Sequence, residues 1–190
     1  RNYHAVTTEY NTLYNGFNAL EQGRQTLNES YSDNYWEILP VERMQVSDEL
    51  ILPGQSKNAD FERAEEKAVK AVQKHGINID GKEKNPQIDE AYLLLGKARY
   101  FDQRFVPAME AFNYILYKYP ASDKINQARI WREKTNLRLE NTELAVANLK
   151  RLLYQEKLKG QDFADATSML AEGYIALEFL DSAIVQLELA

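Results

Sequence analysis

The amino-acid sequence predicts an all-α fold built from repeated pairs of helices. Of the 190 residues, 44% are hydrophobic, which is enough for a core, and the eight Gly and five Pro fall mostly between the candidate helices. One stretch has the spacing of a helix pair, carried by Tyr92, Leu95, Gly96, Ala108, Phe112 and Pro120. Small residues at 96 and 108 let two antiparallel helices cross closely, and the proline, which has no N–H, ends the second helix.

This stretch resembles the tetratricopeptide repeat, whose helix pairs stack into a right-handed solenoid. Its spacing recurs at offsets of 37 and then 38 residues, which align three pairs of alanines: Ala91 with Ala108, Ala128 with Ala145, and Ala166 with Ala183. The second copy departs from the pattern, with Glu133 in place of Gly96 and Lys157 in place of Pro120. The predicted repeats are 86–120, 123–157 and 161–190, the last one truncated. Because such units bury their faces only by stacking, further repeats are expected beyond it.

Residues 1–76 are predicted to form an atypical first repeat that begins with a long helix over 3–28. The helix is indicated by an apolar stripe at helical spacing: Tyr3, Val6, Tyr10, Leu13, Tyr14, Phe17 and Leu20. A core face is the first interpretation of this stripe, and a docking face for another chain is the second. The returning helix is expected over 61–73, with Asp60 as its N-cap, a face of small residues and a stop at Gly76. A polar loop is expected over 77–86.

An extended aromatic loop is predicted between these two helices, because residues 29–58 lack helical periodicity. Tyr31, Tyr35 and Trp36 are expected to pin the loop across the helices, with a short helical piece near 41–50.

The composition argues against several classes of function. The net charge of −6 disfavours a nucleic-acid partner, and no apolar run is long enough to span a membrane. Cysteine is absent, and the only histidines, His4 and His75, lie in different segments without ligand spacing. Phosphate-binding loops and nucleophile motifs are also absent. We therefore predict no catalysis, cofactor, metal or small-molecule substrate, and expect function to reside in a protein-binding surface.

In the tetratricopeptide family the first helix of each pair lines a concave groove, and the resemblance carries that role to matching positions here. The groove lacks the Lys, Asn and Arg set of a carboxylate clamp, which disfavours chaperone docking. Tyrosine-rich surfaces are typical of interface hot spots, so the N-terminal stripe and the aromatic loop are added to the candidates. The candidate partner-binding residues are Tyr3, Tyr10, Tyr14, Phe17, Tyr35, Trp36, Leu93, Lys97, Tyr100, Phe101, Ile130, Lys134 and Arg138.

A second resemblance lies in the first 41 residues. Its blocks are Arg1-Asn2-Tyr3-His4-Ala5, Glu9-Tyr10-Asn11, Tyr14-Asn15-Gly16, Ala19-Leu20, Tyr31-x-Asp33-Asn34-Tyr35 and Ile38-Leu39-Pro40-Val41. Together with the helix-pair repeats that follow, they resemble the N-terminal part of the SprE/PorW family of Bacteroidota lipoproteins.

The resemblance implies a non-catalytic scaffold of the type IX protein secretion and gliding motility machinery. The expected partners are components of the translocon or of the periplasmic motor ring. The expected location is the periplasmic face of the outer membrane, through a lipid anchor upstream of this sequence. Two alternatives stay open: a periplasmic peptidoglycan- or glycan-associated binding module, and a chaperone adaptor.

Overall fold

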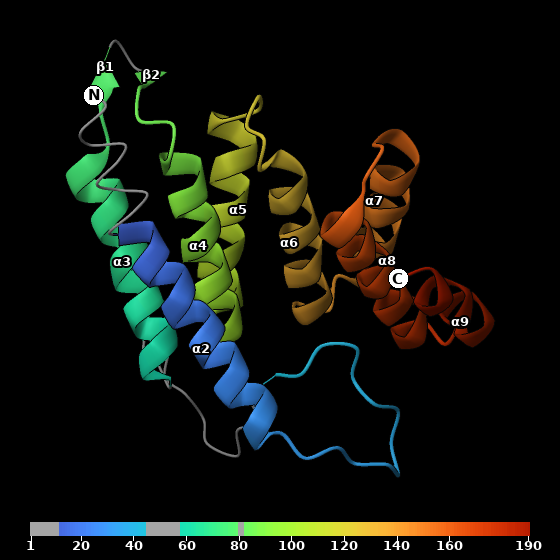
Figure 1. The fold of residues 1–190 in the computed structure, drawn as a ribbon. Helices are drawn as coiled ribbons and strands as arrows, with labels where there is room; N and C mark the ends of the chain where they lie inside the picture. The colour runs from blue at the N-terminus through green and yellow to red at the C-terminus, as the bar shows by residue number, and fades with distance from the viewer. Residues whose placement is uncertain (1–11, 45–57, 80–81) are drawn as a thin grey trace. The chain divides into compact units, whose positions relative to one another are not determined.

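The computed structural model describes residues 12–44, 58–79 and 82–190. These residues form an all-α fold with one very short hairpin (Figure 1). The helices among them are α2 (Tyr14–Ser30), α3 (Ala59–His75), α4 (Ile88–Phe101), α5 (Phe105–Lys118), α6 (Ile125–Arg138), α7 (Thr142–Gln155), α8 (Gly160–Ala176) and α9 (Leu180–Leu189). The predicted fold class is confirmed, and α4–α5, α6–α7 and α8–α9 are the helix pairs of the three predicted repeats. Among the described residues, no helix combines the length and the apolar character needed to cross a membrane.

The chain divides into two compact units. Unit 1 contains α2 to α5, and unit 2 contains residues 32–43 together with 126–190, which carry nearly all of α6 and the whole of α7 to α9. The boundary predicted between 76 and 86 therefore lies inside unit 1, because α3 packs against both α2 and α4. The handedness of the predicted solenoid stays a prediction.

Two glycines bring α2 close to its neighbours in unit 1. A Cβ atom at Gly16 would lie 2.5 Å from Cδ2 of Leu94, and one at Gly23 would lie 2.5 Å from Cε1 of Phe61. Neither glycine could gain a side chain without moving a buried neighbour, so the α2 surface is fitted to α3 and α4. The core-face interpretation of the predicted stripe is wrong at Tyr14, which is 62% exposed. The buried face is made by Leu13, Gly16, Ala19, Leu20, Gly23 and Leu27.

Helix α3 starts two residues before the predicted start, with a different cap. The side chain of Asn58 accepts a hydrogen bond from the backbone N–H of Asp60 at 2.9 Å, so Asn58 and not Asp60 is the N-cap. Four members of the predicted face of small residues are fully buried, namely Phe61, Ala64, Ala68 and Ala71, and the fifth, Val72, is half-buried. The helix ends before Gly76, as predicted.

The predicted polar loop over 77–86 contains a hairpin of β1 (Asn78–Ile79) and β2 (Lys82–Glu83), paired antiparallel. The Glu83 carboxylate organises its base, accepting backbone N–H bonds from Ile77 at 2.8 Å and Asn85 at 2.7 Å. Polar composition identified the loop but could not show this local hydrogen bonding.

The α4–α5 pair has the close crossing that its sequence predicts. A Cβ atom at Gly96 would lie 2.4 Å from the buried ring of Phe112, and Ala108 is fully buried beside it. Pro120 follows the end of α5 by two residues. The rings of Tyr92 and Tyr114 contact each other across the pair in a tilted arrangement, with centroids 4.3 Å apart.

The turn inside each helix pair has the same left-handed geometry. A non-glycine residue has φ near +60° in each turn, and the three recur at the predicted offsets of 37 and 38: Gln103, Glu140 and Glu178. The next residue in each turn donates its backbone N–H five positions back, as Arg104 does to Arg99, Asn141 to Asn136 and Phe179 to Tyr174. This bond satisfies carbonyls at the end of the first helix. The repeat register predicted from alanines is thus reproduced in backbone geometry.

Candidate functional site

The groove positions predicted on α4 lie mostly in the core of unit 1. Leu93, Tyr100 and Phe101 are no more than 3% exposed, and Lys97 is half-buried. Phe101 stacks on Phe61 of α3 with ring centroids 5.6 Å apart. Because α4 packs against both α3 and α5, these three side chains are covered on both sides and a partner cannot reach them in this fold.

The groove positions predicted on α6 are also covered, in part by the chain itself. Ile130 is 1% exposed and belongs to the core of unit 2. The Lys134 ammonium lies 3.1 Å from Oε1 of Glu42 and 4.3 Å from the ring centroid of Trp131. Arg138 pairs with the same Glu42, Nη2 to Oε2 at 3.5 Å, and with Glu172 of α8. Two side chains of the face that was expected to receive a partner, Lys134 and Arg138, therefore form ion pairs with Glu42 of a loop in the same chain.

Glu42 belongs to the loop of residues 32–43, the docking loop. This loop is anchored on the helices of unit 2. Val41 packs against the apolar cluster of α6, α7 and α8, next to the ion pairs of Glu42. Arg43 and Asp33 form an ion pair at 2.9 Å that joins the two ends of the loop. The turn between them is held by Asn34, whose side chain accepts the N–H of Trp36 at 3.2 Å.

The prediction that aromatic residues pin this loop is wrong for Tyr35 and Trp36, whereas Tyr31, which precedes the loop, is half-buried. Tyr35 is 80% exposed and Trp36 is 96% exposed, with Ile38 and Leu39 beside them at 66% and 42%. The anchoring is done by Val41 and Glu42 instead, so the large apolar side chains face solvent. Residues 41–44 are not helical, which corrects the first part of the helix expected near 41–50; the rest lies outside the described residues.

The remaining candidates belong to the N-terminal stripe. Tyr3 and Tyr10 lie outside the described residues, Tyr14 is exposed and Phe17 is half-buried. The structure thus brings Tyr35 and Trp36 together on one exposed surface and places the groove residues in the core. Sequence reasoning missed Ile38, Leu39 and the anchoring pair Val41 and Glu42. The signal was available, since the apolar run Ile38-Leu39-Pro40-Val41, which ends in the carboxylate of Glu42, follows the aromatic pair after a single residue.

Two titratable side chains of unit 1, Glu65 and Tyr92, have shifted pKa values. Burial raises the pKa of Glu65, but hydrogen bonds and positive charge from Arg104 and Arg99 outweigh it and leave that pKa below its usual value. Burial, with the neighbouring Tyr114, raises the pKa of Tyr92 to about 12. Among residues 12–44, 58–79 and 82–190, no group of three or more His, Asp or Glu is placed to hold a metal ion.

No protein-family model matches this sequence, and comparison with curated proteins gives no match. The SprE/PorW resemblance therefore stays a prediction from the residues quoted for it. The exposed aromatic surface of the docking loop is the feature on which a function can be argued.

Proposed function

We propose that this chain is a non-catalytic protein-binding scaffold whose docking loop contacts a partner protein. The observation that carries the proposal is the exposure of Tyr35 and Trp36 on a loop that Val41 and Glu42 anchor and whose two ends are joined by the Asp33–Arg43 ion pair. Tyrosine and tryptophan bury a large area on binding while losing few rotamers, so they are enriched at interface hot spots. A loop anchored before binding also loses less conformational entropy when the partner docks.

The N-terminal resemblance supports a more specific proposal. Tyr35, Ile38 and Leu39 belong both to the blocks shared with the SprE/PorW lipoproteins and to the exposed surface. We therefore propose that the scaffold serves the type IX secretion and gliding motility machinery. Its partner would be a component of the translocon or of the periplasmic motor ring. A lipid anchor upstream would hold it at the periplasmic face of the outer membrane.

The test is site-specific photo-crosslinking from position 36 in the cell that makes the protein. A crosslinker at Trp36 is expected to capture a component of the secretion channel or motor ring. Tyr154 provides the matched control, because it is 92% exposed in the same unit but lies on α7. The double variant Tyr35→Ser with Trp36→Ser is expected to lose secretion of type IX cargo, while Tyr154→Ser is expected to keep it.

Three results would contradict the proposal. Equal capture from positions 36 and 154 would show that exposure alone produces crosslinks. Capture of cytosolic chaperones would favour the adaptor alternative. Sedimentation of the purified chain with peptidoglycan, undiminished by the double variant, would favour the glycan-associated module.

A further inference from the structure

The α6–α7 pair of unit 2 is built differently from the other two pairs. In the α4–α5 pair, a Cβ atom at Gly96 would lie 2.4 Å from the ring of Phe112, so that crossing leaves no room for a side chain. In the α6–α7 pair, Glu133 occupies the repeat position where α4 has Gly96. A glycine lets the facing helix approach to contact, and a glutamate side chain cannot.

Glu133 stays in this position because its carboxylate is fully hydrogen-bonded. Its side chain is 1% exposed. It accepts bonds from Nε of Arg132 at 2.7 Å, from Nδ2 of Asn136 at 2.7 Å and from Nδ2 of Asn148 at 3.1 Å. A buried carboxylate with three donor side chains is a fixed feature of the fold, so the position of Glu133 between α6 and α7 is fixed as well.

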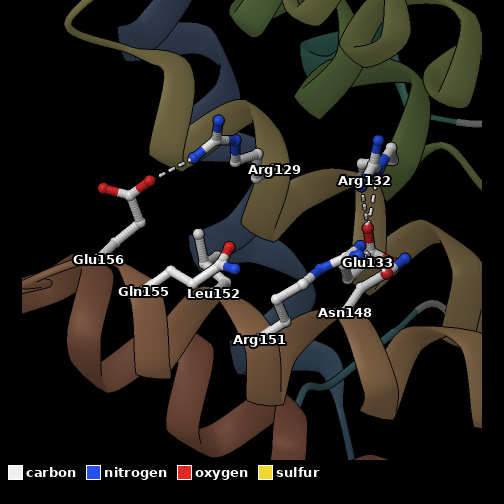
Figure 2. Close-up of a pocket in the computed structure, with 8 residues that line it drawn as sticks. All are labelled: Arg129, Arg132, Glu133, Asn148, Arg151, Leu152, Gln155 and Glu156. Carbon is white, nitrogen blue, oxygen red and sulfur yellow. Dashed lines mark hydrogen bonds and ion pairs between the residues drawn. The ribbon is translucent and has the colours of Figure 1, made fainter.

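A pocket of about 310 Å³ lies between α6 and α7, beside Glu133 (Figure 2). Helix α6 contributes one face of it and α7 the other, over two turns of helix. Leu152, at 6% exposed, supplies an apolar surface that continues into the core of unit 2. The lining residues are Arg129, Arg132, Glu133, Asn148, Arg151, Leu152, Gln155 and Glu156.

The pocket carries one positive charge, since three arginines face two glutamates in a chain whose net charge is −6. Arg129 donates to Glu156 at 2.8 Å, and Arg132 is held by Glu133. Arg151 differs from both, because its hydrogen bond, at 2.7 Å, goes to the neutral side chain of Asn148. Figure 2 shows the Arg151 side chain extending from α7 toward Asn148 and Glu133. The guanidinium keeps its charge uncompensated by a carboxylate within the pocket.

We propose that this pocket binds a carboxylate of an acidic peptide segment, with Arg151 as the principal contact. A guanidinium has five N–H donors, and Arg151 uses one nitrogen for Asn148, so further donors remain for a carboxylate. A single carboxylate matches the net charge of the pocket, whereas a dianionic phosphate would also be repelled by Glu133 and Glu156. Leu152 can contact the methylene groups of a glutamate, and Gln155 can hydrogen-bond to a peptide group. The site lies outside the docking loop, so this proposal and the proposed function can fail independently.

The test is fluorescence anisotropy of the 190-residue chain with labelled peptides. The first probe alternates glycine and glutamate and is blocked at both ends, and the second has glutamine in place of glutamate. The glutamate peptide is expected to bind about tenfold more tightly, in line with hydrogen bonds to a charged group. A third probe, the glutamine peptide with a free C-terminal carboxylate, shows whether the carboxylate comes from a side chain or from a chain end.

Two neighbouring residues of α7 provide the matched variants. Arg151→Gln is expected to weaken binding of the glutamate peptide about tenfold. Lys150→Gln removes the same charge from an exposed residue outside the pocket, and is expected to change the affinity less than about twofold because solvent screens it. Arg129→Gln is a second pocket variant, and circular dichroism checks that all three variants stay folded.

Three results would overturn the proposal. The first is an equal loss of affinity from Arg151→Gln and Lys150→Gln. The others are equal binding of the glutamate and glutamine peptides, and tighter binding of inorganic phosphate than of the glutamate peptide.

Discussion

At the scale of single residues, the ion-pair network of unit 1 is centred on Glu65. Its carboxylate, on α3, accepts a hydrogen bond from Nε of Arg99 at 2.8 Å and another from Arg104. Arg104 in turn contacts Asp102 at 2.7 Å, whose side chain is fully buried. Arg99 thus gives α4 a cationic contact with α3 that an uncharged side chain could not make.

We expect Glu65→Gln to lower the free energy of unfolding by about 1–3 kcal/mol, because two largely buried guanidinium groups lose their charged acceptor. Glu66→Gln, at the exposed neighbouring position, is the control and should change it by less than about 0.5 kcal/mol. The difference should depend on pH. Since the pKa of Glu65 is lowered from 4.5 in the folded chain, its contribution is complete above that value and is lost as the pH falls through the folded pKa. Urea unfolding of the parent and variant should therefore converge at acid pH, and a gap that persists there would contradict this account.

At the scale of elements, the three helix pairs share a turn that is strained in the same way. Gln103, Glu140 and Glu178 adopt left-handed φ values of 61°, 62° and 63°, which a Cβ atom disfavours. The geometry is retained because the following N–H reaches back to the first helix of the pair. The strain thus belongs to the helix-pair architecture and not to a particular side chain.

We expect Glu140→Gly to raise the free energy of unfolding by about 0.5–1 kcal/mol, since glycine relieves the left-handed strain at some cost in entropy. The matched change Glu143→Gly falls in the first turn of α7, where helical φ is required, and should lower stability by about 1 kcal/mol. Thermal unfolding of both variants measures the two effects. Shifts of the same sign would show that the turn at 140 is not strained.

At the scale of the whole molecule, the chain passes between the two units three times. It leaves unit 1 after Tyr31, returns at Met44 and enters unit 2 again after Ile125. The docking loop is therefore part of unit 2 in packing, although it is flanked in sequence by segments of unit 1. Its anchoring rests on Val41 and on the ion pairs of Glu42.

We expect Val41→Asp to release the docking loop without unfolding the helices. Cleavage by chymotrypsin at Tyr35 and Trp36 should then accelerate by about tenfold, the factor that corresponds to about 1.4 kcal/mol of lost anchoring. Ile38→Asp makes the same change at a residue that is 66% exposed, and should leave the rate nearly unchanged. Mass spectrometry of timed digests gives the rates. Equal acceleration by both variants would show that Val41 is not the anchor.

The amino-acid sequence by itself determined the repeat register. Alanines at offsets of 37 and 38 marked the helix crossings, and the predicted pairs coincide with α4–α5, α6–α7 and α8–α9. These features follow from local physics, because small residues, proline and helical periodicity act within one or two turns of the chain. The sequence also identified Tyr35 and Trp36 as candidate binding residues. It predicted at the same time that they would pin the loop, whereas both are exposed.

Only the tertiary structure decided which faces are covered. Periodicity shows which residues share a face of a helix, but the neighbour that packs against the face is set by contacts distant in sequence. For that reason Leu93, Tyr100 and Ile130 were assigned to a groove and lie in the core. For the same reason Glu42, some 90 residues before Lys134 in sequence, could not be recognised as its ion-pair partner. The sequence showed that Glu133 takes the repeat position of Gly96, but the pocket beside it depends on how the side chains of α6 and α7 pack in space.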